Sequence, residues 1–398
     1  MDTVAGKKIV LGITGSIAAY KSVELVRRLK KAGAAVTVVM SANATRFVTP
    51  LTFETLSGNR VIWDMFSQHG TSIDHVSLGQ GADLIVIAPA TANFLAKIAH
   101  GLGDDFLSTL ILAATAKILI CPAMDREMFS NTIVQANILS LKERDFIVME
   151  PEKGMLATGA TGLGRFPDPA SIMEEIRRLL ADHDLEGLKV LITAGPTIEY
   201  IDPVRIVTNR STGKMGYAMA KAARRRGAEV TLVSGPTHLD PPQGIQMIKV
   251  TTADEMREAV LHNYRDKDVV IKAAAVTDYR PLRKAQEKEK KKKGPISVEM
   301  IPTPDILAEL GKNKGAISLV GFAAETTDHV ANAADKIKKK NLDLIVVNDV
   351  SKEDRGFAAD SNEVRMIDRE GNEETVPLMP KEDVAERILD RIKGLRTK

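Results

Sequence analysis

The residues best suited to bind a phosphate or a cofactor follow the first predicted strand. Segment 12–17, Gly-Ile-Thr-Gly-Ser-Ile, leads into a helix, so its backbone N–H groups and the Ser16 hydroxyl can bind a phosphate. The same residues serve equally well as a tight turn with a helix cap. The next strand ends in Ser41 rather than an acidic residue, which suits a mononucleotide better than the ribose of a dinucleotide. Asn93, after a later strand, offers an amide that suits a planar heterocycle.

Strand-like apolar runs alternate with amphipathic helices almost from end to end of the chain. This order predicts an α/β fold of two Rossmann-like, doubly wound domains, the first of them flavodoxin-like. We expect a first domain over 1–181, a linker over 182–187 and a second domain over 188–398. The predicted strands are 9–14, 36–40, 84–88, 118–121 and 146–149 in the first half, and 189–193, 230–233, 269–272, 319–322 and 344–347 in the second.

The composition argues against several classes of protein. The 398 residues carry a net charge of only +3, which gives no global reason to expect nucleic acid or an anionic membrane as partner. The single cysteine, Cys121, allows neither a disulfide within the chain nor a cysteine metal cluster, and we expect it to be a small buried residue. No signal peptide and no stretch able to span a bilayer is visible, so the sequence predicts a cytoplasmic protein.

Three segments of the first half resemble the flavin-containing cysteine decarboxylases. They are Pro-Ala-Thr-Ala-Asn at 89–93, Ile-Asp-His-Val-Ser-Leu at 73–78 and Pro-Ala-Met-Asp-Arg-Glu-Met at 122–128. The resemblance implies bound FMN, and it implies that His75 acts as a catalytic group that accepts a proton near working pH. The flavin contacts that it implies are Gly15, Ser16, Ile17, Ser41, Ala90, Thr91, Asn93 and Ser108.

The implied reaction is decarboxylation of phosphopantothenoylcysteine, in which FMN oxidises the cysteine moiety to a thioaldehyde and takes part in a later reduction. Asp125 stands where the family has an asparagine, and an ionised Asp125 would repel the substrate carboxylate unless a neighbour such as Arg126 pairs with it. Thr158 stands where bacterial relatives carry the cysteine that protonates the enethiol, and a hydroxyl is too weak an acid for that role. We therefore expect a catalytic site of modified chemistry that includes His75, Asp125 and Thr158.

The second half resembles the phosphopantothenate–cysteine ligases. The resemblance rests on the long segment 201–216, which ends in Ser-Thr-Gly-Lys-Met-Gly at the start of a helix. It implies that Asn209 handles an acyl-cytidylate and that Lys288, the first lysine after Glu287 in an otherwise solvated lysine run, meets the nucleotide phosphates. The contacts that it implies for CTP and phosphopantothenate are Arg205, Ala273, Ala274, Asp278, Lys288, Pro304, Asp305, Ile306, Leu307, Phe322, Lys336 and Lys340.

The implied ligase reaction activates the phosphopantothenate carboxylate with CTP, after which the amine of cysteine attacks. Mg²⁺ is expected on the triphosphate, without a metal site of the protein's own. The choice of CTP over ATP rests on the resemblance alone. Lys336 and Lys340 are four residues apart on a predicted helix, so both ammonium groups face one side.

Two other classes of function remain open. A flavodoxin-like electron carrier joined to a sugar-nucleotide domain explains the flavin motifs, but not the segments around Asn209 and Lys288. A regulatory flavoprotein, or an active ligase fused to a flavoprotein domain with altered or lost decarboxylase activity, fits the departures at Asp125 and Thr158. By resemblance we expect small-molecule substrates and a homo-oligomer that combines trimeric decarboxylase and dimeric ligase contacts, up to a dodecamer.

Overall fold

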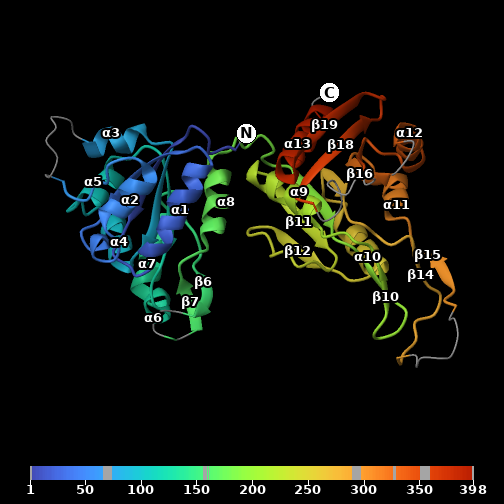
Figure 1. Ribbon diagram of the computed structural model, residues 1–398, viewed down its shortest axis with the longest axis horizontal. Helices are drawn as coiled ribbons and strands as arrows, with labels where there is room; N and C mark the ends of the chain where they lie inside the picture. The colour runs from blue at the N-terminus through green and yellow to red at the C-terminus, as the bar shows by residue number, and fades with distance from the viewer. Residues whose placement is uncertain are drawn as a thin grey trace. The chain divides into compact units, whose positions relative to one another are not determined.

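The chain forms two compact units, Met1–Ala181 and Asp182–Lys398 (Figure 1). The computed structural model describes residues 2–65, 74–155, 159, 161–288, 297–325, 329–349 and 359–396. Each unit has one main sheet with helices on both faces, which confirms the predicted α/β class. In these residues no helix has both the length and the apolar character needed to cross a membrane.

The sheet of the first unit has the strand order β2-β1-β3-β4-β5, and all of its pairs are parallel. This is the flavodoxin-like order, in which ligands bind where the order reverses between β1 and β3. The strands are β1 Lys8–Ile13, β2 Ala35–Met40, β3 Leu84–Ala90, β4 Lys117–Pro122, β5 Ile147–Val148, and the separate hairpin β6 Glu152–Met155 and β7 Thr161–Arg165. The helices are α1 Ala19–Lys31, α2 Pro50–Ser57, α3 Asp74–Gly81, α4 Ala92–Ala99, α5 Phe106–Ala113, α6 Arg126–Ser130, α7 Thr132–Lys142 and α8 Pro169–Leu180.

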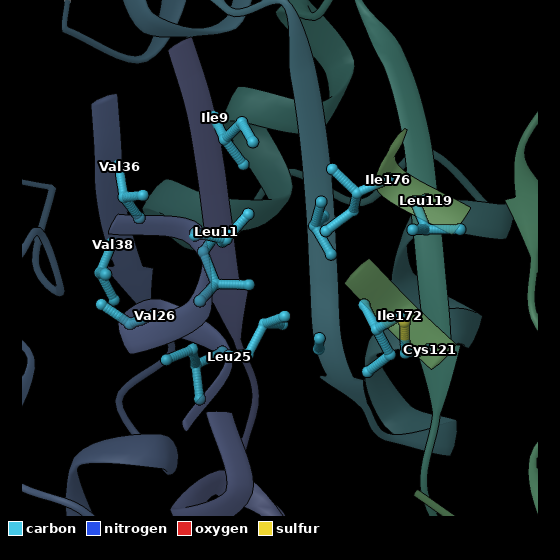
Figure 2. Packing of buried hydrophobic residues seen from close by; sticks show 14 of the residues in the cluster. Ile9, Leu11, Leu25, Val26, Val36, Val38, Leu119, Cys121, Ile172 and Ile176 are labelled. Atoms are coloured by element: carbon cyan, nitrogen blue, oxygen red, sulfur yellow. The ribbon is translucent and has the colours of Figure 1, made fainter. Parts of the chain in front are cut away.

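Helices α1 and α8 cover one face of this sheet, and α4, α5 and α7 cover the other. The apolar residues of α1 recur at helical spacing, so Leu25 and Val26 reach the same cluster as Leu11 of β1 (Figure 2). Cys121 is fully buried in that cluster with Ile172 of α8, which confirms that it is a small core residue. Both faces of the sheet are therefore covered by helices, so we expect the ligand at its carboxyl edge.

The main sheet of the second unit has the order β12-β11-β8-β13-β16-β17-β18-β19. Its first six strands follow the Rossmann order, which reverses between β8 and β13. The strands are β8 Lys189–Ala194, β9 Ile198–Tyr200, β10 Ile206–Thr208, β11 Glu229–Ser234, β12 Gln246–Lys249, β13 Val269–Lys272, β14 Tyr279–Pro281, β15 Met300–Pro302, β16 Ser318–Glu325, β17 Leu344–Asp349, β18 Ser361–Asp368 and β19 Glu373–Pro380. The helices are α9 Lys214–Arg225, α10 Ala253–Asn263, α11 Ile306–Lys312, α12 His329–Lys340 and α13 Lys381–Arg396.

The last two strands, β18 and β19, were not predicted, and they pair antiparallel with their neighbours at the end of an otherwise parallel sheet. Only the short turn between Asp368 and Glu373 joins them, and a turn of that length cannot carry a parallel crossover. Gly371 allows this turn through its positive φ of 85°. Two small hairpins, β9–β10 and β14–β15, lie outside the main sheet.

Arg226 ties the beginning of the second unit to its last helix. Its guanidinium is buried and pairs with Asp184 at 2.6 Å, with Asp390 at 2.7 Å and with Glu386 at 3.5 Å. The hydrogen bonds from Arg226 and Lys393 lower the pKa of Asp184 to about 2, against the opposing effect of partial burial. Segment 182–187 is thereby packed onto the second unit.

We expect Arg226→Met to lower the free energy of unfolding of the second unit by about 3 kcal/mol, because it strands the carboxylates of a buried ion-pair network. Lys393→Met is the control, since this half-exposed cation binds the same Asp184 carboxylate at 2.9 Å and should contribute less than about 1 kcal/mol. The folded pKa of Asp184 lies below its unfolded value, so this stability is present above about pH 4 and is lost as the pH falls toward 2. Urea unfolding between pH 2 and pH 7 measures both effects; equal costs for the two variants contradict the assignment.

Candidate active sites

The turn after β1 is fixed to the end of β3 at the carboxyl edge of the first sheet. The buried Thr14 hydroxyl donates to the Pro89 carbonyl at 2.8 Å and accepts from the Thr91 N–H at 3.0 Å. A Cβ at Gly15 would lie 2.5 Å from the Cβ of Asn43, so only glycine fits there. The backbone of the predicted phosphate turn is thus held open by contacts from two other strands.

Two serines lie at this turn, and only one of their hydroxyls has a hydrogen-bond partner in the described part of the chain. Ser16 accepts from the Ala18 N–H at 3.2 Å as the chain enters α1. Ser41 anchors the end of β2 through its N–H to Ile13 at 2.9 Å, but its buried hydroxyl has no hydrogen-bond partner within the described ranges. A buried polar group of this kind requires a ligand or water, so the cradle formed by Gly15 and Ser41 fits a bound cofactor. Ile17 lies beside it with its side chain 57% exposed.

The other predicted flavin contacts lie on α4 and α5. Ala90 is buried, Thr91 caps α4, and Asn93 is exposed in the first turn of that helix. Ser108 is fully buried, and its hydroxyl and N–H form a capping box with Asp105 at 3.1 and 2.8 Å. The Ser108 hydroxyl is therefore engaged inside the protein, and its contact with a flavin stays a prediction.

His75, the predicted catalytic histidine, is half-buried near the start of α3. Its ring packs edge-to-face against Phe106 of α5, with 6.1 Å between ring centroids. Among the described residues, His75 is not one of those that line the hollow beside Asp125. Within one chain, these two predicted catalytic groups are thus not brought together.

Asp125 lines a hollow of about 650 Å³ between α1, the β4–α6 loop and the β6–β7 hairpin. Its carboxylate accepts from the Glu127 N–H at 3.0 Å and so caps α6. The hairpin is locked onto the loop by Gly164, whose carbonyl accepts from the Met124 N–H at 3.0 Å. A Cβ at Gly164 would collide with the Met124 carbonyl, and its φ of 141° also disfavours other residues.

Two positions bear on the final proton transfer in this half. Thr158 lies outside the described residues, so its predicted role stays a prediction. Burial raises the pKa of the Cys121 thiol strongly, and its sulfur lies 3.7 Å from that of Met149. Cys121 is therefore kept as a thiol inside the core, and it does not take the place of a catalytic cysteine.

In the second unit, the turn after β8 is built on close approaches at glycines. A Cβ at Gly235 would collide with the Pro196 carbonyl, and one at Gly216 would lie 2.5 Å from the Cβ of Ala194. Gly213 precedes α9 with a φ of 80° and provides no side-chain cap. The first turn of α9 is therefore packed tightly against the end of β8, and its N–H groups face a ligand site.

A small hollow of about 110 Å³ lies at this end of α9. Asn348 and Asn362 line this hollow, and their buried amide oxygens have no hydrogen-bond partner among the described residues. The buried Lys381 adds a positive charge. The remaining lining includes the predicted contacts Ala273 and Phe322. The N-terminus of α9 and the Lys381 cation suit an anionic group of a ligand. The two amide oxygens are acceptors, so they suit a hydrogen-bond donor of the same ligand.

Asn209 follows the β9–β10 hairpin and reaches the segment after β13. Its side-chain amide donates to the Ala275 carbonyl at 2.9 Å, and Ala274 is held by its N–H to the Thr193 hydroxyl at 3.1 Å. The second N–H of the Asn209 amide remains able to donate to a substrate oxygen. Arg205 pairs with the buried Asp202 at 3.1 Å, which stabilises the loop that leads into β10.

Lys288 is exposed at the end of a segment that is pinned to β9. The Ala285 N–H donates to the Ile201 carbonyl at 3.0 Å, and the Lys284 ammonium lies 4.5 Å from the ring centre of Tyr200. Both contacts bring the segment to the β9–β10 hairpin that carries Asn209. Asp278 is also exposed. Its backbone carbonyl accepts a hydrogen bond from the Thr303 N–H at 2.9 Å, next to the start of β14.

A charged cluster lies on the face of the sheet that α11 and α12 cover, opposite to α9. It consists of Asp305, Lys340 and Lys272. Asp305 caps α11 and pairs with Lys340 of α12 at 2.8 Å, which lowers its pKa although partial burial opposes this. Burial lowers the pKa of Lys272, at the end of β13, to about 8. Lys336 is half-buried one turn before Lys340, Pro304 is partly exposed, and Ile306 and Leu307 are buried in the core.

Sequence reasoning missed Lys272, and it also missed Lys21 and Arg165 in the hollow of the first unit. A cation that ends a parallel strand lies at the ligand edge of the sheet, and this signal identifies Lys272 in the sequence. Lys21 and Arg165 carry no comparable local signal, because they come from α1 and β7.

The fold and the sites define a two-unit α/β protein with a candidate ligand site at the carboxyl edge of each main sheet. The family described as "Flavoprotein" matches residues 2–181, and "DNA/pantothenate metabolism flavoprotein C-terminal domain" matches residues 185–395. The coenzyme A biosynthesis bifunctional protein CoaBC of Bacillus subtilis strain 168 is 46% identical over 98% of this chain and 97% of that protein. The protein of the same name from Escherichia coli strain K12 is 41% identical over 98% of this chain and 97% of that protein. The chain belongs to the family of coenzyme A biosynthesis bifunctional proteins, as its motifs predicted, and its first unit is a flavoprotein.

One solved structure similar to this chain is the C-terminal domain of a coenzyme A biosynthesis bifunctional protein CoaBC. It covers 54% of this chain and 99% of that chain, with 44% identity and a TM-score of 0.48.

We expect Gly164→Ala to detach the β6–β7 hairpin from the Met124 loop, because the added Cβ collides with a backbone carbonyl and its φ is unfavourable. Amide exchange of residues 152–155 and 161–165 should rise about 10-fold or more, which corresponds to a local cost of at least about 1.4 kcal/mol. Gly159→Ala is the matched control, since Gly159 also has a positive φ but nothing within 4 Å of an added Cβ. Equal exchange rates in both variants would show that the close approach does not hold the hairpin.

Proposed function

We propose that this chain catalyses two consecutive steps of coenzyme A biosynthesis. The second unit joins cysteine to 4′-phosphopantothenate with CTP, and the first unit decarboxylates the product to 4′-phosphopantetheine. The observation that carries this proposal is the match of both halves to the bifunctional family over 98% of the chain. The two cradles at the carboxyl edges of the sheets agree with it, since one suits a mononucleotide and the other an anionic substrate with a nucleotide.

In the first unit, we assign FMN to the cradle of Gly15, Ser16 and Ser41, whose buried hydroxyl and open backbone support this placement. When bound, the flavin supplies a reversible two-electron sink for the cysteine moiety of the substrate. The β6–β7 hairpin and the Met124 loop form two sides of the hollow in which the substrate would lie. His75 accepts the proton that leaves the substrate thiol, because a neutral imidazole nitrogen can act as a general base.

Asp125 shapes this site in a way that asparagine would not. Its carboxylate caps α6 through the Glu127 N–H, so its position is fixed by the helix. A fixed negative charge beside the substrate carboxylate disfavours the ground state, and this repulsion is relieved when neutral carbon dioxide leaves. Asp125 thus favours loss of the carboxylate rather than its retention.

In the second unit, an oxygen of the phosphopantothenate carboxylate attacks the α-phosphorus of CTP, and pyrophosphate leaves. The amine of cysteine then attacks the acyl carbon, and CMP leaves as the amide forms. We assign the free N–H of the Asn209 amide to the acyl oxygen, where negative charge develops. Lys288 meets the phosphates as a mobile point charge, while Lys272, Lys336 and Lys340 bind them from the α11–α12 side.

Mg²⁺ accompanies CTP as a phosphate-bound ion in this proposal. Within the described ranges no three His, Cys, Asp or Glu side chains gather around a metal position. The triphosphate and water then supply the ligands of the ion, as Mg²⁺ commonly prefers.

Reconstitution tests the two-step proposal. The FMN-loaded chain, supplied with 4′-phosphopantothenate, CTP, Mg²⁺ and cysteine, should release pyrophosphate and carbon dioxide, and both products should be visible by mass. Asn209→Ala should slow amide formation about 100-fold and leave decarboxylation of added phosphopantothenoylcysteine unchanged. Lys272→Met should raise KM for CTP about 10-fold with little change in kcat.

Two results would change this assignment. Pyrophosphate release without carbon dioxide identifies an active ligase fused to a flavoprotein domain that has lost decarboxylase activity. No pyrophosphate release at saturating CTP and Mg²⁺ contradicts the ligase.

We also infer that the decarboxylase site is completed by a second copy of the chain. The support is that His75 does not line the hollow that holds Asp125 within one chain. Oligomers with trimeric decarboxylase contacts and dimeric ligase contacts provide such a copy.

Complementation tests this arrangement. His75→Asn and Asp125→Ala should each abolish decarboxylation, and their co-expression should restore roughly a quarter of the wild-type rate, since a random mixture of copies leaves that share of sites intact. Each variant alone is the control for leakage. No recovery in mixed oligomers of confirmed composition shows that one chain supplies both groups.

A further inference from the structure

The hollow of the first unit contains two cations that neither the flavin cradle nor the catalytic groups use. Lys21 comes from the first turns of α1, and Arg165 ends β7. In the part of the chain that the structure describes, neither makes an ion pair within 4.0 Å or a side-chain hydrogen bond. Two cations that line one cavity create a positive potential there, which raises the local concentration of an anionic ligand.

The nearby carboxylates are engaged elsewhere. Glu152 accepts from the Asp168 N–H at 2.8 Å, and Asp168 caps α8 through the Ala170 N–H at 2.7 Å. Burial and the charge of Arg165 lower the pKa of Lys21, and the charges of Glu152 and Asp168 oppose this. The two cations therefore raise each other's energy in the absence of an anion, and a dianionic group placed between them would relieve that repulsion.

Apart from Ser16 and Asp125, the other side chains that line the hollow are apolar or aromatic. Ile17, Tyr20 and Met155 are 57%, 60% and 72% exposed, and Phe166 forms the buried floor. An elongated ligand with an anionic end and an apolar middle suits this lining. At about 650 Å³ the cavity lies in the size range of sites for small molecules.

We propose that Lys21 and Arg165 form the binding site for the phosphate monoester at the far end of the decarboxylase substrate. This inference rests on the proposed function, because it takes phosphopantothenoylcysteine as the ligand of the hollow. The site holds the end of the substrate that does not react.

The chemistry of decarboxylation decides between the two anionic ends of that substrate. The reacting carboxylate loses its charge as carbon dioxide leaves, so a cation paired with it would stabilise the ground state more than the transition state and slow the reaction. The phosphate keeps its charge throughout, and binding energy gained there holds the reacting end in place without this penalty. The pair of cations therefore suits the phosphate, while Asp125 lies on the side of the carboxylate.

The flavin also carries a phosphate monoester, so the experiment must separate these two sources. The FMN-loaded full chain is titrated calorimetrically with 4′-phosphopantetheine and with pantetheine, which differ only in the phosphate and do not turn over. The variants are Lys21→Met, Arg165→Met and the double variant. Lys153→Met is the matched control, because Lys153 is an exposed cation of the same hairpin that does not line the hollow.

We expect wild type to bind 4′-phosphopantetheine about 100-fold more tightly than pantetheine, since each charge-assisted contact contributes roughly 10-fold. Each single variant should lose about 10-fold of this preference and the double variant nearly all of it, with the affinity for pantetheine and the flavin content unchanged. Flavin absorbance verifies folding, and Arg165→Lys should retain part of the preference.

Three results overturn the subsite. Loss of flavin in proportion to loss of charge assigns the cations to the flavin phosphate. Equal weakening of both ligands shows that the cations only support the hairpin. An unchanged preference in the double variant shows that they do not meet the phosphate. The titration measures binding and needs no turnover. A failure of decarboxylation in the reconstitution would therefore contradict the proposed function without deciding whether this phosphate site exists.

Discussion

Both sites depend on backbone segments that approach one another more closely than any side chain allows. In the first unit, Gly164 lies against the Met124 carbonyl and Gly15 against Asn43. In the second unit, Gly235 lies against the Pro196 carbonyl and Gly216 against Ala194. These contacts bring loops from the ends of different strands to one edge of each sheet, where backbone N–H groups are left to face a ligand. Without them the turns after β1 and β8 would be ordinary turns.

Cations in the core are paired with carboxylates of the protein, whereas several cations at the candidate sites are not. Arg226 is buried among three carboxylates, so its charge is compensated and its network supports the fold. Lys272 is desolvated beside one ion pair, and Lys21 and Arg165 are left without partners in the described part of the chain. Cations whose charge the protein does not compensate are favourable only when a ligand supplies the negative charge. This distinction separates residues that stabilise the protein from residues that bind substrates.

Within one chain, the first unit keeps two of its predicted catalytic groups apart. His75 packs on Phe106, and Asp125 caps α6 at the edge of a hollow that His75 does not line. Cys121 is buried near Met149 and is removed from the chemistry by its raised pKa. By resemblance the sequence motifs assign His75 and Asp125 to one reaction, whereas packing within a single chain does not bring these two residues to the same hollow.

Local pattern determined the class of fold and most of the strands, because alternation of apolar runs, glycine turns and helices is written into neighbouring residues. It also located the turn at 12–17 and the buried state of Cys121, whereas the segment around Asn209 was recognised by its resemblance to a family. The antiparallel pair β18–β19 was not predicted, since a short turn rather than a strand pattern decides the direction of β19 relative to β18. Only the tertiary structure engages Ser108 in its capping box, brings Lys272 to Asp305 and Lys340, and places Lys21 beside Arg165. These pairs join elements that are far apart in the sequence, and only the packing of whole helices against a sheet specifies which of their side chains meet.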